Sequence, residues 1–348
     1  MNRSTFSVFG LLFAVLLCVP ANADTFTFTT LDDPSAAYST NPCGISGNNI
    51  VGYYWGLEPQ GFIYNGSTYT TINDPLALGG QGTWAQGISG SNVVGYYVPN
   101  QGPTQGFIHN GSTYTPCDDP QGVNGTWAEG IDGNNIVGYY WDISEQYHGF
   151  IYNGSTYTRL DDPLEAWGTA ATGISGNNVV GYYADSSDER HGFIYNISTN
   201  SYTTLDDPLE GQQATYGTFA LGISGNNIVG FYYDSSGEAH GFLYNGSTYT
   251  TIDDPLAAKG VNKGTYATGI SGNNIVGYYT DSSGYDHGFI ATTPEPSTFA
   301  LLGIGAIGLT AYAWRRRRLA VELAASSQDV QATLSFPSRK AEATRRAA

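Results

Sequence analysis

Short runs of alternating apolar and polar residues fill the middle of the chain, and four such runs recur in every unit of an internal repeat. The runs are rich in Ile, Val, Tyr, Phe and Thr, and Gly, Asn, Asp and Ser separate them, which is typical of β-strands joined by tight turns. Each unit carries Gly-Ile-Ser-Gly or a near copy, beginning at Gly44, Gly87, Gly130, Gly173, Gly222 and Gly269. Four strands every 43 to 49 residues predict the blades of a β-propeller.

The chain ends of the repeat region predict how the ring closes. The four predicted strands of a unit are typified by Thr265–Ser271, Asn274–Tyr279, His240–Tyr244 and Ser247–Ile252. The last unit lacks its fourth strand, and a run of that type, Thr25–Leu31, stands instead at the start of the region. We therefore expect an all-β fold, a six-bladed propeller of four-stranded blades that the N-terminal strand closes.

The connections between strands sort into two kinds. Ser-Gly-Asn-Asn and Asn-Gly segments are tight hairpin turns, and both fall on one face of an up-and-down blade. The Asp-Ser-Ser loops and the Asp-Asp-Pro loops must then share the opposite face, which carries most of the acidic residues. We expect any ligand of the repeats to bind at this acidic face.

The N-terminus has the features of a secretory signal. Arg3 is followed by an apolar run from Phe6 to Cys18, and Ala21 and Ala23 form the small-x-small pattern that signal peptidase recognises. The sequence predicts a signal peptide over residues 1–23 and a mature chain that starts at Asp24. The alternative is a short anchor that is never removed.

A second apolar segment, residues 299–314, lies near the C-terminus. Pro294, Glu295 and Pro296 precede it, and four positive charges follow it at Arg315, Arg316, Arg317 and Arg318. This order resembles the PEP-CTERM sorting signal. The resemblance implies an exported protein, a hydrophobic helix that inserts in the membrane before processing, and an exosortase-like enzyme as partner. The arginines would stay cytoplasmic, which places the repeats outside.

One feature departs from that family. Its signals end soon after the arginines, whereas this chain continues as a basic tail over residues 319–348, which we expect to be disordered. The alternative is an ordinary single-span anchor. The predicted domains are therefore 1–23, 24–293, 294–318 and 319–348.

Charge limits the partners of the repeat region. Residues 24–293 hold 26 Asp and Glu against four basic residues, a net charge near −22. Such a surface repels nucleic acid and anionic lipid headgroups, and it suits cations or neutral sugars. We expect no nucleic-acid partner.

The repeat also resembles HAF-type extracellular repeats. His-Gly-Phe stands at His148, His191, His240 and His287, with Gln60 and Gln105 in place of His in the first two units. The resemblance implies an exported β-repeat protein and brings no catalytic residues. Because the repeat spreads the histidines around a ring, we expect them to make structural hydrogen bonds.

Paired acids in the Asp-Asp-Pro loops are the candidate metal ligands. Calcium takes six to eight oxygen ligands, whereas the same acids can also cap a turn before proline. The candidates are Asp161, Asp162, Asp206, Asp207, Asp253 and Asp254. We expect no resident cofactor, with calcium as the one alternative.

Aromatic residues before the first strand of several units are the candidate ligand-binding groups. They are expected at equivalent places, and they either stack on sugar rings or wedge between blades. The candidates are Trp84, Trp127, Trp167, Tyr216 and Tyr266.

The remaining motifs have structural alternatives. Cys43 and Cys117 either pair or stay free, and His109 is expected on the surface. Five Asn-x-Ser/Thr sequons fit hairpin turns better than glycosylation sites, namely those at Asn65, Asn110, Asn153, Asn196 and Asn245.

The sequence favours a non-enzymatic protein of the cell surface or extracellular matrix. The alternative is a lectin-like module that binds extracellular polysaccharide through the acidic face. A hydrolase would need a unit with unique buried acids, and the repeats show no such unit and no Ser-His-Asp pattern.

Overall fold

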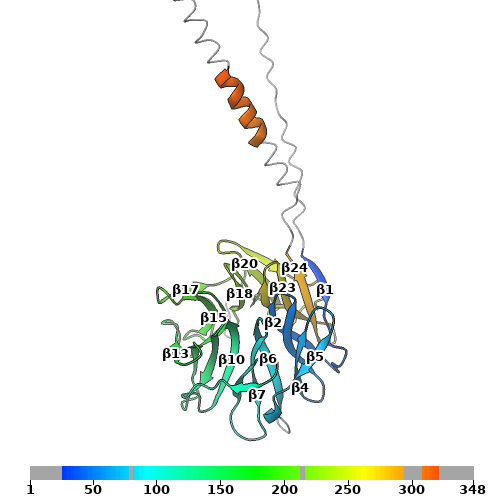
Figure 1. The fold of residues 1–348 in the computed structure, drawn as a ribbon, viewed down its shortest axis with the longest axis vertical. Coiled ribbons are helices and arrows are strands. Elements are labelled where there is room, and N and C mark those ends of the chain that lie inside the picture. Colours follow the sequence, from blue (N-terminus) through cyan, green and yellow to red (C-terminus); the bar gives the residue numbers. More distant parts are fainter. Residues whose placement is uncertain (1–25, 78–80, 212–215, 294–307, 321–348) are drawn as a thin grey trace, which may run out of the picture. The chain divides into compact units, whose positions relative to one another are not determined.

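The computed structural model describes residues 26–77, 81–211, 216–293 and 308–320. Residues 25–293 form one compact unit, an all-β propeller in which groups of strands follow one another around a centre (Figure 1). Residues 308–320 form a helix that belongs to a second unit. The prediction of an all-β propeller and one C-terminal helix is confirmed.

Several predicted segments lie outside the described residues. They are the signal peptide with Ala21 and Ala23, the sorting residues Pro294, Glu295 and Pro296, and residues 321–348 of the tail. The helix includes all four arginines and ends two residues past Arg318. Among the described residues, no helix is long and apolar enough to cross a membrane.

Within the part of the chain that the structure describes, the strands form four sheets of four and one sheet of eight. Consecutive strands of a sheet pair antiparallel within each group of four. The first two sheets contain β2 (Thr40–Ser46), β3 (Asn49–Trp55), β4 (Pro59–Tyr64) and β5 (Tyr69–Ile72), then β6 (Gly82–Ser89), β7 (Asn92–Val98), β8 (Gln105–His109) and β9 (Tyr114–Pro116). A 3-10 turn, η1 (Pro75–Ala77), connects them.

The later repeats build the remaining sheets. The eight-stranded sheet contains β10 (Gly125–Asp132), β11 (Asn135–Trp141), β12 (Tyr147–Tyr152), β13 (Tyr157–Leu160), β14 (Gly168–Ser175), β15 (Asn178–Ala184), β16 (Arg190–Asn196) and β17 (Ser201–Leu205). The last two sheets contain β18 (Thr218–Ser224), β19 (Asn227–Tyr233), β20 (Ala239–Tyr244) and β21 (Tyr249–Ile252), then β22 (Thr265–Ser271), β23 (Asn274–Thr280), β24 (Asp286–Thr292) and β1 (Thr27–Thr30).

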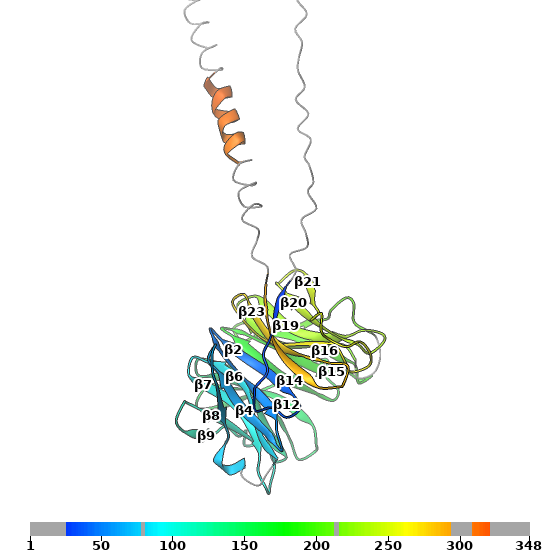
Figure 2. The ribbon, with the colours of Figure 1, turned by 90° about the vertical axis from the view of Figure 1, so that its right-hand side faces the viewer.

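The N-terminal strand completes the last sheet, as the sequence predicts. β1 pairs antiparallel with β24, from Thr27 opposite Thr292 to Thr30 opposite Phe289. In Figure 2 the first repeat, in blue, lies beside the last, in orange, and strand β2 contacts both β22 and β23. The first and last repeats therefore meet.

Hydrogen bonds between the hairpin turns of neighbouring repeats also connect the last repeat to the first. In every repeat the residue after Gly-Ile, a Ser or once an Asp, accepts a hydrogen bond from the glycine N–H of a neighbouring turn. The donor–acceptor pairs are Gly90–Ser46, Gly133–Ser89, Gly176–Asp132, Gly225–Ser175, Gly272–Ser224 and Gly47–Ser271. These bonds pass through all repeats and return to the first.

The core lies between neighbouring sheets and is centred on the Phe of each His-Gly-Phe or Gln-Gly-Phe motif. Phe193 is fully buried, and its ring packs on Gly181 of the preceding strand's Val-Gly-Tyr run. A Cβ on Gly181 would lie 2.0 Å from the Ala170 carbonyl oxygen and 2.8 Å from the Phe193 ring. Glycine before Tyr is therefore required by packing, and the motif is structural.

Side-chain caps shorten the predicted fourth strand. The run from Ser247 is predicted as strand, but β21 begins at Tyr249. Asn245 Oδ1 accepts hydrogen bonds from the backbone N–H groups of Ser247 and Thr248, which keeps these residues in the turn.

Candidate functional site

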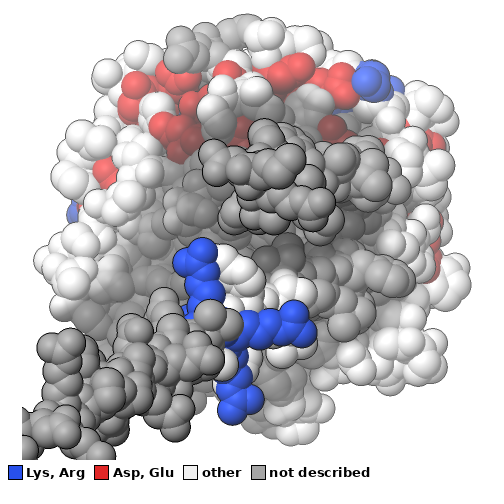
Figure 3. Space-filling model, turned by 90° about the horizontal axis from the view of Figure 1, so that it is seen from above, with Lys and Arg blue, Asp and Glu red and all other residues white. Residues whose placement is uncertain are grey.

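The two longer connections of each repeat meet on one surface, which we call the loop face. It consists of the Asp-Ser-Ser-type loops and the Asp-Asp-Pro loops. Figure 3 shows acidic side chains gathered in one region of the propeller surface. The loop face is held together by the repeated histidines, which bridge the two kinds of loop.

Each repeated histidine lies between two aspartates. His191 Nδ1 is 3.0 Å from Asp206 Oδ2, and its Nε2 is 3.9 Å from Asp185 Oδ2. The same arrangement holds at His148, His240 and His287. The hydrogen bond to the Asp206 carboxylate raises the pKa of His191, and the bond to Asp253 does the same for His240. These histidines join the two loops of their repeat, as structural hydrogen bonds should.

The two acids of each Asp-Asp-Pro loop have different roles. The first, such as Asp161, faces the histidine, and the second, such as Asp162, is buried. Asp162 Oδ1 accepts a hydrogen bond from the Leu164 N–H, and the Asp162 N–H donates to Thr169 Oγ1. Asp207 and Asp254 repeat this pattern. The second acids cap turns, so the pairs do not face one common point.

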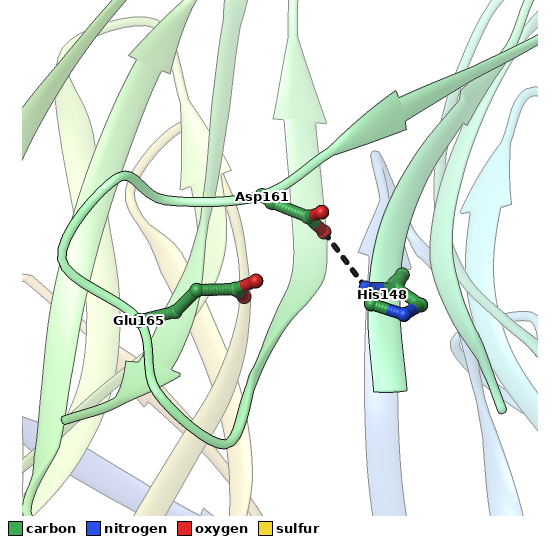
Figure 4. Close-up of side chains that lie close together, drawn as sticks. All are labelled: His148, Asp161 and Glu165. Atoms are coloured by element: carbon green, nitrogen blue, oxygen red, sulfur yellow. Dashed lines mark hydrogen bonds and ion pairs between the residues drawn. The ribbon is translucent and has the colours of Figure 1, made fainter. Parts of the chain in front are cut away.

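In two repeats a glutamate lies beside the histidine and the aspartate that it contacts. Figure 4 shows Asp161 pointing toward His148, with Glu165 extending from the following loop. In the groups His148–Asp161–Glu165 and His191–Asp206–Glu210, the potential ligand atoms lie within 4.8 Å of one another. Burial raises the pKa of Glu210 to about 7, and Thr218 donates a hydrogen bond to it. The predicted ligands Asp161 and Asp206 thus have His and Glu neighbours, which the aspartate pattern alone misses.

A second feature is a cavity of about 380 Å³ with mostly aromatic walls. Tyr182 and Phe219 have ring centroids 4.9 Å apart, and Tyr216 and Tyr233 have theirs 5.2 Å apart. We call it the aromatic cavity, and it is lined by Tyr139, Trp141, Tyr147, Tyr182, Arg190, Tyr216, Phe219, Tyr233 and Asn262.

Polar groups at the cavity come from positions that vary between repeats. Arg190 lies directly before His191, where the preceding repeat has Tyr147 before His148. The Arg190 guanidinium contacts Asp188, and the Arg190 backbone N–H donates to the Tyr216 carbonyl at 2.9 Å. The Tyr147 hydroxyl is protonated at neutral pH, because tyrosine has an ordinary pKa of about 10 and burial raises it further. The cavity therefore offers a guanidinium, an amide and phenol hydroxyls beside flat apolar rings.

Only one of the predicted aromatic ligand residues, Tyr216, lines this cavity. Trp84 stacks on Tyr96 at 5.2 Å, and Trp127 stacks on Tyr139 at 5.1 Å. Tyr266 stacks on Tyr278 in the same way, at 4.7 Å. These three occupy one position within their first strands, where they pack between aromatic neighbours.

The prediction of five equivalent positions is wrong. Trp167 lies immediately before Gly168, the first residue of β14, and Tyr216 lies before the equivalent Gly217, next to β18. Both are three residues earlier in their repeats than Trp84, Trp127 and Tyr266. Trp167 is half-exposed there, and its backbone N–H donates to the Ala184 carbonyl. Some repeats have an aromatic residue in the loop before the first strand, and others have one within that strand. The sequence pattern alone does not separate these two positions.

Two further predictions need correction. His109 is buried rather than at the surface, because its ring packs 4.5 Å from that of Tyr114, and burial lowers its pKa. The repeats also hold one acid at a position where no other repeat has an acid, Glu129, which is partly buried and lines a cavity at the centre of the ring. The sequence signal for this acid is that the residue before Gly-Ile differs between repeats. Only the ring arrangement shows that these residues lie around one cavity.

The structure shows unpaired cysteines and sequon asparagines that cap their own turns. Cys43 and Cys117 are free thiols, and Cys117 is buried. Each sequon asparagine accepts hydrogen bonds from its own turn, as Asn65 Oδ1 does from the Ser67 and Thr68 N–H groups. This fits the turn interpretation of the sequons.

Comparison with solved structures finds matches at low sequence identity. A mutant of the Aleuria aurantia lectin bound to α-methyl-L-fucoside is 16% identical and has a TM-score of 0.47, covering 78% of this chain and 99% of that one. TolB from Acinetobacter baumannii is 12% identical with a TM-score of 0.45, covering 74% and 64%. Trypanosoma rangeli sialidase is 9% identical with a TM-score of 0.44, covering 73% and 55%.

Sequence comparison gives a specific result at the C-terminus only. A search of curated proteins found no match to the chain. Residues 292–318 match the PEP-CTERM protein-sorting motif. This motif is a sorting signal for exosortase processing, so the chain carries the C-terminal signal of an exported protein.

Proposed function

We propose that this chain is a non-enzymatic protein of the cell surface or extracellular matrix, and that its propeller binds a neutral saccharide in the aromatic cavity. The signal peptide (1–23) directs export, and an exosortase-like enzyme processes the sorting segment (294–318). Residues 24–293 then act outside the membrane as a lectin-like module. The HAF-type likeness of the repeats agrees with an exported protein.

The aromatic cavity is the observation that carries the saccharide proposal. Sugar rings present C–H faces that pack on aromatic planes, and hydroxyl groups that need hydrogen-bond partners. Tyr216 and Trp141 supply planes, while Arg190 and Asn262 supply donors at the same cavity. Its volume of about 380 Å³ lies within the range of small-molecule sites.

Charge selects neutral sugars over acidic ones. Residues 24–293 carry a net charge near −22. Arg190 is the one cation among the described residues that line the cavity, and it already contacts Asp188. A polyanionic glycan would therefore meet net repulsion at this surface.

We also infer that the ring has six blades, with the eight-stranded sheet counting as two. The two halves of that sheet, β10–β13 and β14–β17, join only through the parallel pair Tyr147–Gly168. Isolated parallel bridges occupy the same place between other neighbours, at Thr104–Gly125, Arg190–Gly217 and Ala239–Gly264. A crystal structure of residues 24–293 tests the count, and a ring of fewer blades would contradict it.

A glycan array tests the binding proposal. Residues 24–293 are applied to neutral and acidic glycans at high protein concentration, in the presence and absence of calcium. We expect retention on a subset of neutral glycans, independent of calcium. No retention on any glycan would remove the saccharide proposal and leave an exported structural protein.

Mass spectrometry of the protein from its native host tests the export proposal. We expect an N-terminus at Asp24 and loss of the residues after the Pro294-Glu295-Pro296 segment. A Glu295→Ala variant should retain its C-terminus. An intact chain that keeps residues 1–23 and 319–348 would contradict the proposed processing.

A further inference from the structure

The propeller axis holds a second cavity, which we call the central channel. It has a volume of about 260 Å³ and is lined by one Gly-Ile pair from each of the six repeats, with Tyr53 and Tyr278. Because every repeat contributes the same position, the channel lies where the repeats meet. It shares no lining residue with the aromatic cavity.

The Gly-Ile pairs make the channel wall alike in every repeat, but the residue before each pair differs between repeats. The residue before each Gly-Ile lines the channel, and its type differs around the ring: Cys43, Gln86, Glu129, Thr172, Leu221 and Thr268. Of the described residues that line the channel, Glu129 is the single acid, and none is a Lys, Arg or His. Among the described residues, its carboxylate makes no hydrogen bond or ion pair, although it lies within the fold.

Glu129 is partly buried, and a carboxylate that is partly removed from water and has no protein partner is stabilised by a cation that joins it. Burial raises the pKa of Glu129 to about 8, and the nearby Glu129 charge contributes to raised pKa values at Tyr96, Tyr139 and Tyr53. The phenols therefore surround the acid without neutralising it. A cation of single charge would complete this site.

The surrounding wall distinguishes between kinds of cation. Calcium takes six to eight oxygen ligands and usually several carboxylates, whereas the channel offers one carboxylate. Six isoleucines and the aromatic rings near Glu129 instead present apolar and π surfaces, which favour alkylated ammonium groups. The volume equals that of about nine waters at roughly 30 Å³ each, enough for a small organic ion.

We propose that the central channel binds a small, monovalent alkylammonium ion, with the Glu129 carboxylate as its counter-charge. Binding requires the ionised carboxylate and therefore releases a proton from Glu129 when the free acid is protonated. Cys43, Tyr53, Tyr96, Tyr139 and Tyr182 face this group, and each has a pKa raised above its usual value. None of these five therefore changes charge between pH 7 and 9.

Calorimetric titration of residues 24–293 with tetramethylammonium chloride tests the proposal. We expect binding that is about tenfold tighter at pH 9 than at pH 7, as a carboxyl pKa of about 8 requires. Matched titrations use sodium, potassium and calcium chloride. Equal binding of sodium or potassium, or binding of calcium alone, would overturn the assignment to an alkylammonium ion.

Two variants connect binding to the carboxylate. Glu129→Gln keeps the shape of the side chain and should lose at least tenfold in affinity, whereas Glu165→Gln on the loop face should bind as the parent does. The double variant Gln86→Glu with Glu129→Gln moves the acid to the neighbouring ring position and should restore binding. Unchanged affinity in Glu129→Gln, with its thermal unfolding intact, would overturn the proposal.

Discussion

His287 Nδ1 lies 2.9 Å from Asp32 Oδ2, although 255 positions separate the two residues in the chain. The contact joins the last repeat to the segment that follows β1. Next to it, buried Leu31 packs in a cluster that contains Ile50 of the first repeat and Val276 of the last. The N-terminal segment therefore fastens the two ends of the repeat region together.

Removal of this segment should open the ring. A chain that starts at Asp32 lacks β1 and leaves the backbone edge of β24 unpaired, which favours self-association. We expect a lower thermal midpoint and concentration-dependent oligomers by light scattering. A synthetic peptide of residues 24–31 should restore the midpoint. A truncated chain that unfolds like the parent and stays monomeric would show that β1 is dispensable.

The histidine bridges predict that stability increases as pH falls from 8.5 to 6.5. His191 and His240 have raised pKa values in the fold, so the folded state binds protons more tightly than the unfolded state. This stabilisation is fully present below the unfolded histidine pKa of about 6.5 and is lost as pH rises through the folded pKa. Burial raises the pKa of Glu129 to about 8, which acts in the same direction. Urea unfolding at the two pH values measures the difference.

The chain itself supplies the control for this effect. Gln60 and Gln105 replace the histidine in the first two repeats, and each contacts a tyrosine hydroxyl, Tyr54 or Tyr97. His240→Gln should therefore fold, lose roughly 0.5 kcal/mol at pH 6.5 and show a weaker pH dependence. A variant with the parent's full pH dependence would mean that the bridges do not titrate.

Glycine before Tyr in the second strand should tolerate no side chain. Gly181→Ala places a Cβ 2.0 Å from the Ala170 carbonyl and against Phe193, so we expect a loss above about 3 kcal/mol or failure to fold. Gly176→Ala is the matched change in a hairpin turn with a φ of 57° and open space around it. It should cost about 1 kcal/mol. Similar losses at both sites in urea unfolding would contradict the packing account.

The two cysteines should not stabilise the fold through a disulfide. Cys43 and Cys117 are free, and burial raises the pKa of Cys117 to about 11. A reducing agent should leave the thermal midpoint unchanged, and thiol labelling should be slow until the protein unfolds. A midpoint that falls on reduction would indicate a disulfide.

Much of the fold could be predicted because the strand and turn patterns within each repeat are local in sequence. The strand runs, the Asn-Gly turns and the displaced N-terminal strand follow from periodicity and turn chemistry. The predicted strand Thr265–Ser271 has the bounds of β22. Errors occurred where one side chain alters a local pattern, as Asn245 does by holding Ser247 and Thr248 in the turn.

The candidate sites could be predicted only in part, because they depend on differences between repeats. Glu129 occupies a position where other repeats have Cys, Gln, Thr or Leu, and only ring closure brings these side chains to one axis. The aromatic cavity likewise combines residues of neighbouring repeats, such as Trp141 and Tyr216. The repeat pattern is defined by residues that are the same in every unit. The candidate binding sites instead depend on positions where the residue differs between units.

The central claim is that the aromatic cavity binds a saccharide, and a matched pair of tryptophan variants tests it most directly. Trp141 lines the cavity, and Trp55 holds the same position in the first repeat with similar exposure, 39% against 42%. Calorimetric titration with a glycan identified on the array gives the affinity of each variant. We expect Trp141→Ala to lose at least tenfold in affinity and Trp55→Ala to match the parent. Equal affinities for both variants would contradict the account.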